Sequence, residues 1–127
     1  MGKGPNIPAD MVFLDLEDAV APKEKEASRA RIVSAIRGND WGDKVLCVRV
    51  NDWSTKWTAY DIMEVVGGAG ERLDEIMLPK VENAAQIVAT DLLLRQVEIA
   101  GGLPVGHIGI EAQIETARGL INVEEIC

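Results

Sequence analysis

Three carboxylates lie within four residues at the end of an apolar run near the N-terminus. Asp15, Glu17 and Asp18 follow the apolar residues 11–14. Acids this close repel one another unless a cation, an arginine or a set of N–H donors offsets their charge. Asp15 and Glu17 share a strand parity with Phe13, so their side chains should leave the strand on the same side. The alternative interpretation is a strand that runs into a solvated acidic turn.

Polar residues of one parity also end three later apolar runs. They are Arg49 and Asn51 in the second run, Lys80 and Glu82 in the third, and Glu111, Gln113 and Glu115 in the fourth. Continuous apolar runs are typical of strands that are buried in a parallel sheet. We therefore expect charged and amide groups from four strand ends to meet at one edge of the sheet. The predicted rim contains Asp15, Glu17, Arg49, Lys80 and Glu115.

The four runs recur at intervals of roughly thirty residues, which is the length of one strand–helix unit. Strands are predicted over residues 11–16, 45–50, 75–78 and 107–114. Helices are predicted between them over about 23–36, 58–66 and 83–101, and another begins near Thr116.

Sequence signals also predict where the helices end and which sides they bury. Gly67-Gly68 should end the second helix, Asn83 should cap the third, and Gly101-Gly102 should end it. The buried side of the third helix is predicted from its apolar residues Ile87, Val88, Leu92 and Val97.

Alternating strands and helices at this spacing predict a parallel sheet with right-handed crossovers. A doubly wound sheet and part of a barrel would both fit the pattern. The polar strand ends favour a barrel, because its active site is built from the C-terminal ends of several strands. An open sheet would need such groups only at one switch point, and no glycine-rich nucleotide motif follows any strand. The predicted fold class is α/β, a partial (β/α)8 TIM barrel of about four parallel β/α units.

The composition limits the kinds of partner. The chain has 127 residues, a net charge of −8 and 47% hydrophobic residues, so nucleic acid and anionic membrane are not expected as partners. The N-terminus lacks a signal-peptide core and no run is long enough to span a membrane, which predicts a cytoplasmic protein. Cys47 and Cys127 suggest neither a zinc site nor a disulfide framework. The lone histidine, His107, is interpreted as structural.

Four ordered segments resemble one branch of a known family, the citrate lyase β-subunit and malyl-CoA lyase branch of the HpcH/HpaI aldolases. The segments are FLDLEDAVAPKEK (13–25), CVRVND (47–52), IMLPKVEN (76–83) and EAQIETARGL (111–120). The aldolase branch tends to have a histidine where this chain has Asp18, so the acyl-CoA branch is favoured.

The resemblance implies a (β/α)8 barrel that uses Mg²⁺ to make or break a carbon–carbon bond between an acyl-CoA and a 2-oxoacid. It implies that Arg49 binds the oxoacid carboxylate and that Glu115 is a metal ligand. Glu17 and Asp18 are implied to lie close to the metal and the arginine, as catalytic residues. Lys80 is predicted to bind substrate, with a structural ion pair as the alternative.

The chemistry of these side chains suits the implied roles. Mg²⁺ takes hard oxygen ligands and keeps several waters, so one or two carboxylates plus substrate oxygens complete its shell. The guanidinium of Arg49 can donate two parallel hydrogen bonds to a planar carboxylate. An interior arginine otherwise needs partners, which Glu17 or Asp18 could supply, and a purely structural Arg–Glu pair is the alternative.

Residues 1–127 are predicted to form one partial barrel domain that lacks the family's first strand and C-terminal half. A full barrel takes around 250 residues, and half of one leaves open strand edges. We therefore expect the chain to form a homo-oligomer and to be inactive as a lyase on its own. Two functional classes follow: the recognisable part of an acyl-CoA lyase, or a non-catalytic half-barrel that acts as a binding or assembly module.

Overall fold

The computed structural model describes residues 4–127, and its centre is a four-stranded parallel sheet in the order β1-β2-β3-β4. The strands are β1 (Met11–Asp15), β2 (Val45–Arg49), β3 (Glu75–Leu78) and β4 (Gly109–Ala112). All three neighbouring pairs are parallel. Parallel strands in sequential order confirm the predicted α/β class of four β/α units, and a doubly wound order is excluded. Residues 1–3, which belong to the segment tested for a signal peptide, lie outside the described residues.

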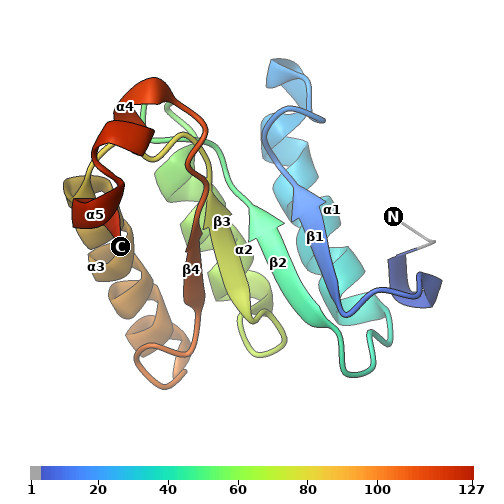
Figure 1. The fold of residues 1–127 in the computed structure, drawn as a ribbon. Coiled ribbons are helices and arrows are strands. Elements are labelled where there is room, and N and C mark those ends of the chain that lie inside the picture. The colour runs from blue at the N-terminus through green and yellow to red at the C-terminus, as the bar shows by residue number, and fades with distance from the viewer. Residues whose placement is uncertain (1–3) are drawn as a thin grey trace.

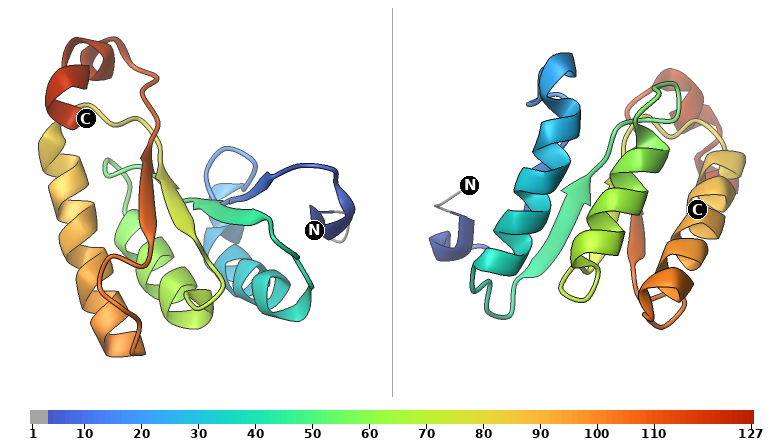
Figure 2. Two further views of the ribbon diagram at one scale, coloured as in Figure 1. Left: turned by 60° about the horizontal axis from the view of Figure 1, so that its bottom comes forward. Right: turned by 180° about the vertical axis from the view of Figure 1, so that it is seen from behind.

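Three long helices alternate with the strands and cover one face of the sheet (Figures 1 and 2). They are α1 (Lys25–Gly38), α2 (Thr58–Ala69) and α3 (Ala84–Gly101). Two short helices, α4 (Ala117–Ile121) and α5 (Val123–Ile126), follow β4, and 3-10 turns occupy Gly4–Asn6 and Pro22–Glu24. In the part of the chain that the structure describes, no helix has the length and apolar character that crossing a membrane requires.

The core lies between the sheet and these helices. Strand residues of one parity, such as Leu14, Val48 and Ile76, pack there against helix residues such as Ile32 and Ile62. The opposite parity points away from the helices, as the register of the strand pairs requires. We call this second side the open face of the sheet. In a complete barrel it would face the barrel axis.

Side chains of different character line the open face. Phe13 is 49% exposed, whereas Cys47 and Met77 are buried between their neighbours. The face ends in charged groups where the strands reach their C-termini, among them Asp15 and Arg49, which lie opposite each other in the β1–β2 register. The predicted gathering of polar strand ends on one side of the sheet is therefore observed.

Two helix boundaries test the sequence signals directly. Asn83 caps α3 with a capping box, in which its side chain accepts from the Gln86 amide, and Gly102 ends the helix at φ 72°. The prediction that Gly67-Gly68 ends the second helix is wrong, because α2 continues to Ala69. A Cβ at Gly68 would lie 2.9 Å from the Val33 side chain, so this glycine permits close contact between α1 and α2.

The predicted buried side of α3 is partly wrong. Ile87 and Val97 pack against the core, but Val88 and Leu92 are each 56% exposed. The core-facing residues of α3 instead include Leu94, which is buried. The helix is covered by the sheet and α2 on one side only, so its second apolar stripe faces outward.

Candidate functional site

The arginine at the end of β2 is held by the carboxylate at the end of β1. Arg49 donates from Nε to Asp15 Oδ1 at 2.8 Å and from Nη2 to Asp15 Oδ2 at 2.7 Å. Both residues end their strands and face each other in register, so the two-pronged contact follows from the pairing of β1 with β2. Glu17 or Asp18 was expected from the sequence as the partner of Arg49, and the structure adds Asp15 as the principal one.

Asp15 also shapes the turn that follows β1. Its Oδ1 accepts from the Glu17 amide at 2.8 Å, and its Oδ2 accepts from the Ala19 amide at 3.0 Å. Side-chain acceptance of backbone amides two to four residues ahead is the usual way in which aspartate fixes a tight turn. The acidic segment is therefore an ordered turn that directs the Glu17 side chain back over the strand ends.

Glu17 lies between two cations. The residue is only 5% exposed, and its Oε2 lies 3.3 Å from Arg49 Nη1. Its Oε1 accepts from Lys80 Nζ at 2.6 Å, which joins the end of β1 to the segment after β3. A buried carboxylate needs such partners, since its desolvation is otherwise unfavourable.

Lys80 connects the two sides of the site through its ammonium and its backbone. The ammonium contacts Glu17 and lies 3.8 Å from Asp52 Oδ2, while the backbone N–H donates to Glu115 Oε1 at 3.0 Å. Its φ of 53° lies in the left-handed region, which side chains with a Cβ adopt at an energetic cost. Lys80 thus lies between Glu17 and Glu115, whose positions in the chain are 98 residues apart.

The remaining acids of the site are more exposed. Glu115 is exposed, between the end of β4 and the Thr116 cap of α4. Asp18 is also exposed and, within residues 4–127, takes part in no hydrogen bond or ion pair. The structure therefore brings Asp15, Glu17, Arg49, Lys80 and Glu115 to one rim and leaves Asp18 at its margin.

The proton equilibria reflect these contacts. Burial alone would raise the pKa of Asp15, but hydrogen bonds from Arg49 and from two backbone amides outweigh it and lower the pKa. The hydrogen bond to Asp15 raises the pKa of Arg49, and the hydrogen bond to Glu17 raises the pKa of Lys80. Asp15 is therefore ionised at neutral pH, and Arg49 and Lys80 are both cations there.

The donor set suits a hard cation. Mg²⁺ binds one or two carboxylates and keeps several waters, and the exposed carboxylate of Glu115 meets that requirement at the edge of the site. Glu17 and Asp52 supply further carboxylate oxygens around Lys80. These oxygens are of the type that Mg²⁺ prefers, and Glu115 is the most accessible of the three carboxylates.

A second cluster lies deeper on the open face. One ligand atom each from Cys47, Glu75 and Glu111 can come within 4.8 Å of one another, the single such group of three in the described part of the chain. Burial and the two glutamates raise the pKa of the Cys47 thiol to about 12. Burial, then Glu111 and Asp74, raise the pKa of Glu75. The Cys47 thiol therefore stays protonated at neutral pH, which opposes metal binding by its thiolate.

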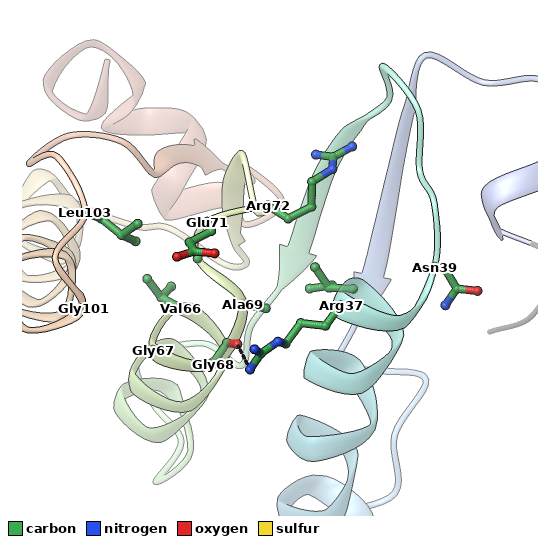
Figure 3. A pocket seen from close by; sticks show the side chains of 12 residues that line it. Arg37, Asn39, Val66, Gly67, Gly68, Ala69, Glu71, Arg72, Gly101 and Leu103 are labelled. Atoms are coloured by element: carbon green, nitrogen blue, oxygen red, sulfur yellow. Dashed lines mark hydrogen bonds between the residues drawn. The ribbon is translucent and has the colours of Figure 1, made fainter.

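A hollow of about 440 Å³ lies at the other end of the sheet (Figure 3). It is lined by the C-terminal ends of α1 and α2 and by Leu103, with Arg37 donating to the Gly68 carbonyl at 3.4 Å. No residue of the rim lines it. His107 also lies away from the rim, since its Nε2 is 3.0 Å from the Gly70 carbonyl oxygen.

A buried polar group lies beneath the rim, and of its four members only Asn51 was expected from the sequence among the polar strand ends. It comprises Lys25, Arg29, Asn51 and Asp61, each at most 5% exposed. Lys25 and Arg29 are spaced by four residues at the start of α1, which places them on one side of that helix. This spacing, next to the apolar positions of the same helix, is the sequence signal from which the burial of Lys25 and Arg29 could have been predicted.

Comparison with known proteins adds an independent line of support. The HpcH/HpaI aldolase/citrate lyase model matches residues 1–127. The chain is 46% identical over 118 residues to L-malyl-CoA/beta-methylmalyl-CoA lyase of Cereibacter sphaeroides, covering 93% of this chain and 37% of that protein. It is 38% identical to citrate lyase subunit beta of Leuconostoc mesenteroides subsp. cremoris, covering 93% and 38%. The chain thus spans little more than a third of these relatives.

Solved structures agree on the fold. The magnesium/glyoxylate complex of Haloferax volcanii malate synthase superposes with a TM-score of 0.81 at 20% identity, covering 94% of this chain and 38% of that one. The four motif segments, the sequential parallel sheet and the match over the whole chain agree with one another. The chain belongs to the HpcH/HpaI aldolase/citrate lyase family.

Proposed function

We propose that this chain is the oxoacid-binding part of a Mg²⁺-dependent acyl-CoA carbon–carbon lyase. Such an enzyme would cleave or form the bond between an acyl-CoA and a 2-oxoacid, for example acetyl-CoA and glyoxylate. The observation that carries the proposal is the Arg49 guanidinium, which Asp15 fixes with two hydrogen bonds at the C-terminal edge of the sheet. The names of the relatives, which are malyl-CoA and citrate lyases, support the reaction class.

Arg49 is proposed to bind the oxoacid carboxylate. An arginine has five N–H donors, and Asp15 takes two of them. The remaining donors, on Nη1 and Nη2, can bind the oxoacid once Glu17 gives up its 3.3 Å contact. Each charge-assisted hydrogen bond contributes about 1.5–3 kcal/mol. Asp15 thus orients the guanidinium without using all of its capacity.

The acids and the lysine are proposed to control charge around the bound oxoacid. As substrate enters, Glu17 gives up its contact with Arg49 and keeps the one with Lys80, since it already contacts both. Lys80, whose side chain is 45% exposed, can turn its ammonium toward the substrate. Asp18 is exposed and can exchange a proton with the reacting groups. Glu17 and Asp18 are therefore the proposed catalytic carboxylates.

Glu115 is proposed as the magnesium ligand. When bound, Mg²⁺ would polarise the oxoacid carbonyl and stabilise negative charge on its oxygen. The hydrogen bond from the Lys80 amide orients Glu115 for that role. Glu115 would therefore hold the cation close to Arg49, which orients the substrate.

We further propose that the 127 residues do not catalyse the reaction alone and associate with copies of themselves in the cytoplasm. The rim supplies one accessible metal carboxylate, and the relatives are almost three times as long as the matched region. Among residues 4–127, no further strand pairs with the outer edge of β1 or of β4, so the backbone groups there can pair with another chain. The free thiols of Cys47 and Cys127 suit a reducing compartment.

A non-catalytic binding or assembly module is the second candidate. It is favoured by one observation: the single positive charge of Arg49 is already balanced by Asp15 and Glu17, as a purely structural cluster would require. The two candidates differ in whether the rim exchanges its partners for a substrate. Turnover by a complete enzyme distinguishes them.

The test uses the chain extended to the length of its relatives, with acetyl-CoA release from malyl-CoA measured in Mg²⁺ and in EDTA. We expect release in Mg²⁺, little in EDTA, and none from the 127 residues alone. Glu115→Gln should lower both magnesium affinity and turnover, whereas the matched change Glu124→Gln, on the exposed surface of α5, should affect neither. An extended chain without turnover would favour the module, and full activity of Glu115→Gln would refute the metal assignment.

A further inference from the structure

A buried ammonium lies directly beneath the acidic turn. Lys25, at the start of α1, is only 5% exposed. Its Nζ donates to the Leu16 carbonyl at 2.8 Å, to the Glu17 carbonyl at 2.6 Å and to Asn51 Oδ1 at 2.6 Å. A lysine ammonium has three donors, so these three acceptors use all of them. Two of the three belong to the backbone that carries Glu17.

Further buried groups hold the same segment from below. Asn51 Nδ2 donates to the Leu16 carbonyl at 3.1 Å and to Asp61 Oδ2 at 2.6 Å. Asp61 Oδ2 also accepts from the Asn51 amide at 3.0 Å, and its Oδ1 accepts from Arg29 Nε at 2.8 Å. The turn after β1 is therefore connected to β2, α1 and α2 by groups that solvent does not reach.

Stability alone is a weak reason for such an arrangement. Burial of a charge is unfavourable, and all three partners of Lys25 are neutral. What the three hydrogen bonds do provide is a fixed direction for two successive carbonyls at the end of β1. That direction determines where the Glu17 side chain begins.

We infer that Lys25 is a positioning residue, which holds the backbone at Leu16 and Glu17 so that the Glu17 carboxylate lies between Arg49 and Lys80. Asn51 is its buried partner in this role. This role concerns only where Glu17 lies at the rim. The consequence for catalysis rests in addition on the proposed function. Loss of Lys25 should therefore weaken the 2.6 Å contact between Glu17 and Lys80 even though Lys25 touches neither side-chain group.

The sign of one measurable shift separates this role from simple electrostatics. The hydrogen bond that Lys80 donates to Glu17 is the main reason that the pKa of Lys80 is raised. If Lys25 acted only as a nearby positive charge, Lys25→Met would raise the pKa of Lys80 further, because one repulsive charge disappears. If Lys25 positions Glu17, the same variant should lower the pKa of Lys80 toward its ordinary value.

The experiment is an NMR titration of the Lys80 ammonium in the 127-residue chain, for wild type, Lys25→Met and Thr90→Val. Thr90 is the control, because it is 0% exposed and hydrogen-bonded to Trp53 and Gln86, outside the rim. We expect the pKa of Lys80 to fall in Lys25→Met and to stay at the wild-type value in Thr90→Val. An unchanged or higher pKa of Lys80 in folded Lys25→Met would overturn the inference.

A second variant keeps the test decisive if Lys25→Met does not fold. Lys25→Arg retains the charge and hydrogen-bond donors but changes their geometry, so it should also lower the pKa of Lys80. A pKa of Lys80 equal to that of wild type in folded Lys25→Arg would then overturn the inference. The readout needs no turnover, so an inactive extended enzyme would refute the proposed function while leaving this result intact.

Discussion

The strained backbone at Lys80 makes a sharp prediction about stability. Lys80 is the one non-glycine residue with a positive φ among residues 4–127, at 53°. A left-handed conformation costs a residue with a Cβ about 1–2 kcal/mol. Glycine avoids that cost but loses about 0.4–1 kcal/mol through its more flexible unfolded state. Lys80→Gly should therefore be more stable than Lys80→Ala, by about 0.5–1 kcal/mol.

Loss of the ion pair with Glu17 determines how the stability of both variants compares with that of wild type. Lys80 is 45% exposed at its side chain, so screening limits the value of its contact with Glu17 to about 1 kcal/mol or less. Lys80→Ala should therefore be less stable than wild type by the value of this contact. Lys80→Gly should stay within about 0.5 kcal/mol of the wild-type stability, because relief of strain offsets the loss of the contact. In a chain of this size the two variants should differ in Tm by about 3 °C.

The assay is urea unfolding followed by circular dichroism at matched protein concentration. The control is Asp43, an exposed loop residue without a positive φ, where the order should reverse and the glycine variant should be the weaker one. The reasoning would be refuted by a Lys80→Ala variant that is as stable as Lys80→Gly, provided that Asp43 behaves as expected.

Three further predictions concern Glu75, the two cysteines and Glu98. Burial and Glu111 raise the pKa of Glu75, so ionisation of Glu75 destabilises the fold as pH rises through that pKa. Glu75→Gln should therefore raise the urea midpoint at neutral pH and lose this advantage in acid. An equal gain in urea midpoint at both pH values would contradict the prediction. A thiol reagent should label exposed Cys127 quickly and buried Cys47 only on unfolding, as mass spectrometry can show. Glu98 is fully buried and accepts from two backbone amides of the loop before β4, so Glu98→Ala should lose about 2–4 kcal/mol in urea unfolding; a loss below about 1 kcal/mol would argue against this role.

The parts of the fold set by periodicity were predictable. The parity of Asp15 and Arg49 follows from the alternation of strands, and the structure places both on one side. Glu17 reaches the same side through the turn that follows β1. The strand limits were close, although β4 is restricted to Gly109–Ala112 instead of 107–114. Capping chemistry at Asn83 was also readable, because a capping box is a local signal.

The errors arise where tertiary contacts override local signals. Gly67-Gly68 looks like a helix end, but the space between α1 and α2 requires a residue without a Cβ at Gly68. The outward stripe of Val88 and Leu92 depends on which neighbours cover α3, which periodicity does not specify. The same limit applies to the site.

Within the site, the sequence identified the charged residues better than their pairing. Arg49 was predicted to pair with Glu17 or Asp18, and Asp15 became the main partner because strand register places it directly opposite. Lys25 was missed, and Asn51 was expected among the polar strand ends but lies buried beneath them, because the partners of both residues are long-range contacts. The metal role of Glu115 and the catalytic roles of Glu17 and Asp18 stay predictions.

The most direct measurement compares Arg49→Lys with wild type in the chain extended to the length of its relatives. Condensation of acetyl-CoA with glyoxylate is followed while glyoxylate and Mg²⁺ are varied in turn, with Arg31→Lys on the exposed side of α1 as the matched control. Lysine keeps the charge but loses the two-pronged geometry, so the KM for glyoxylate should rise by about 10- to 100-fold, with little change in Mg²⁺ dependence. An unchanged KM for glyoxylate, or an effect on Mg²⁺ alone, would contradict the assignment of Arg49 as the oxoacid-binding residue.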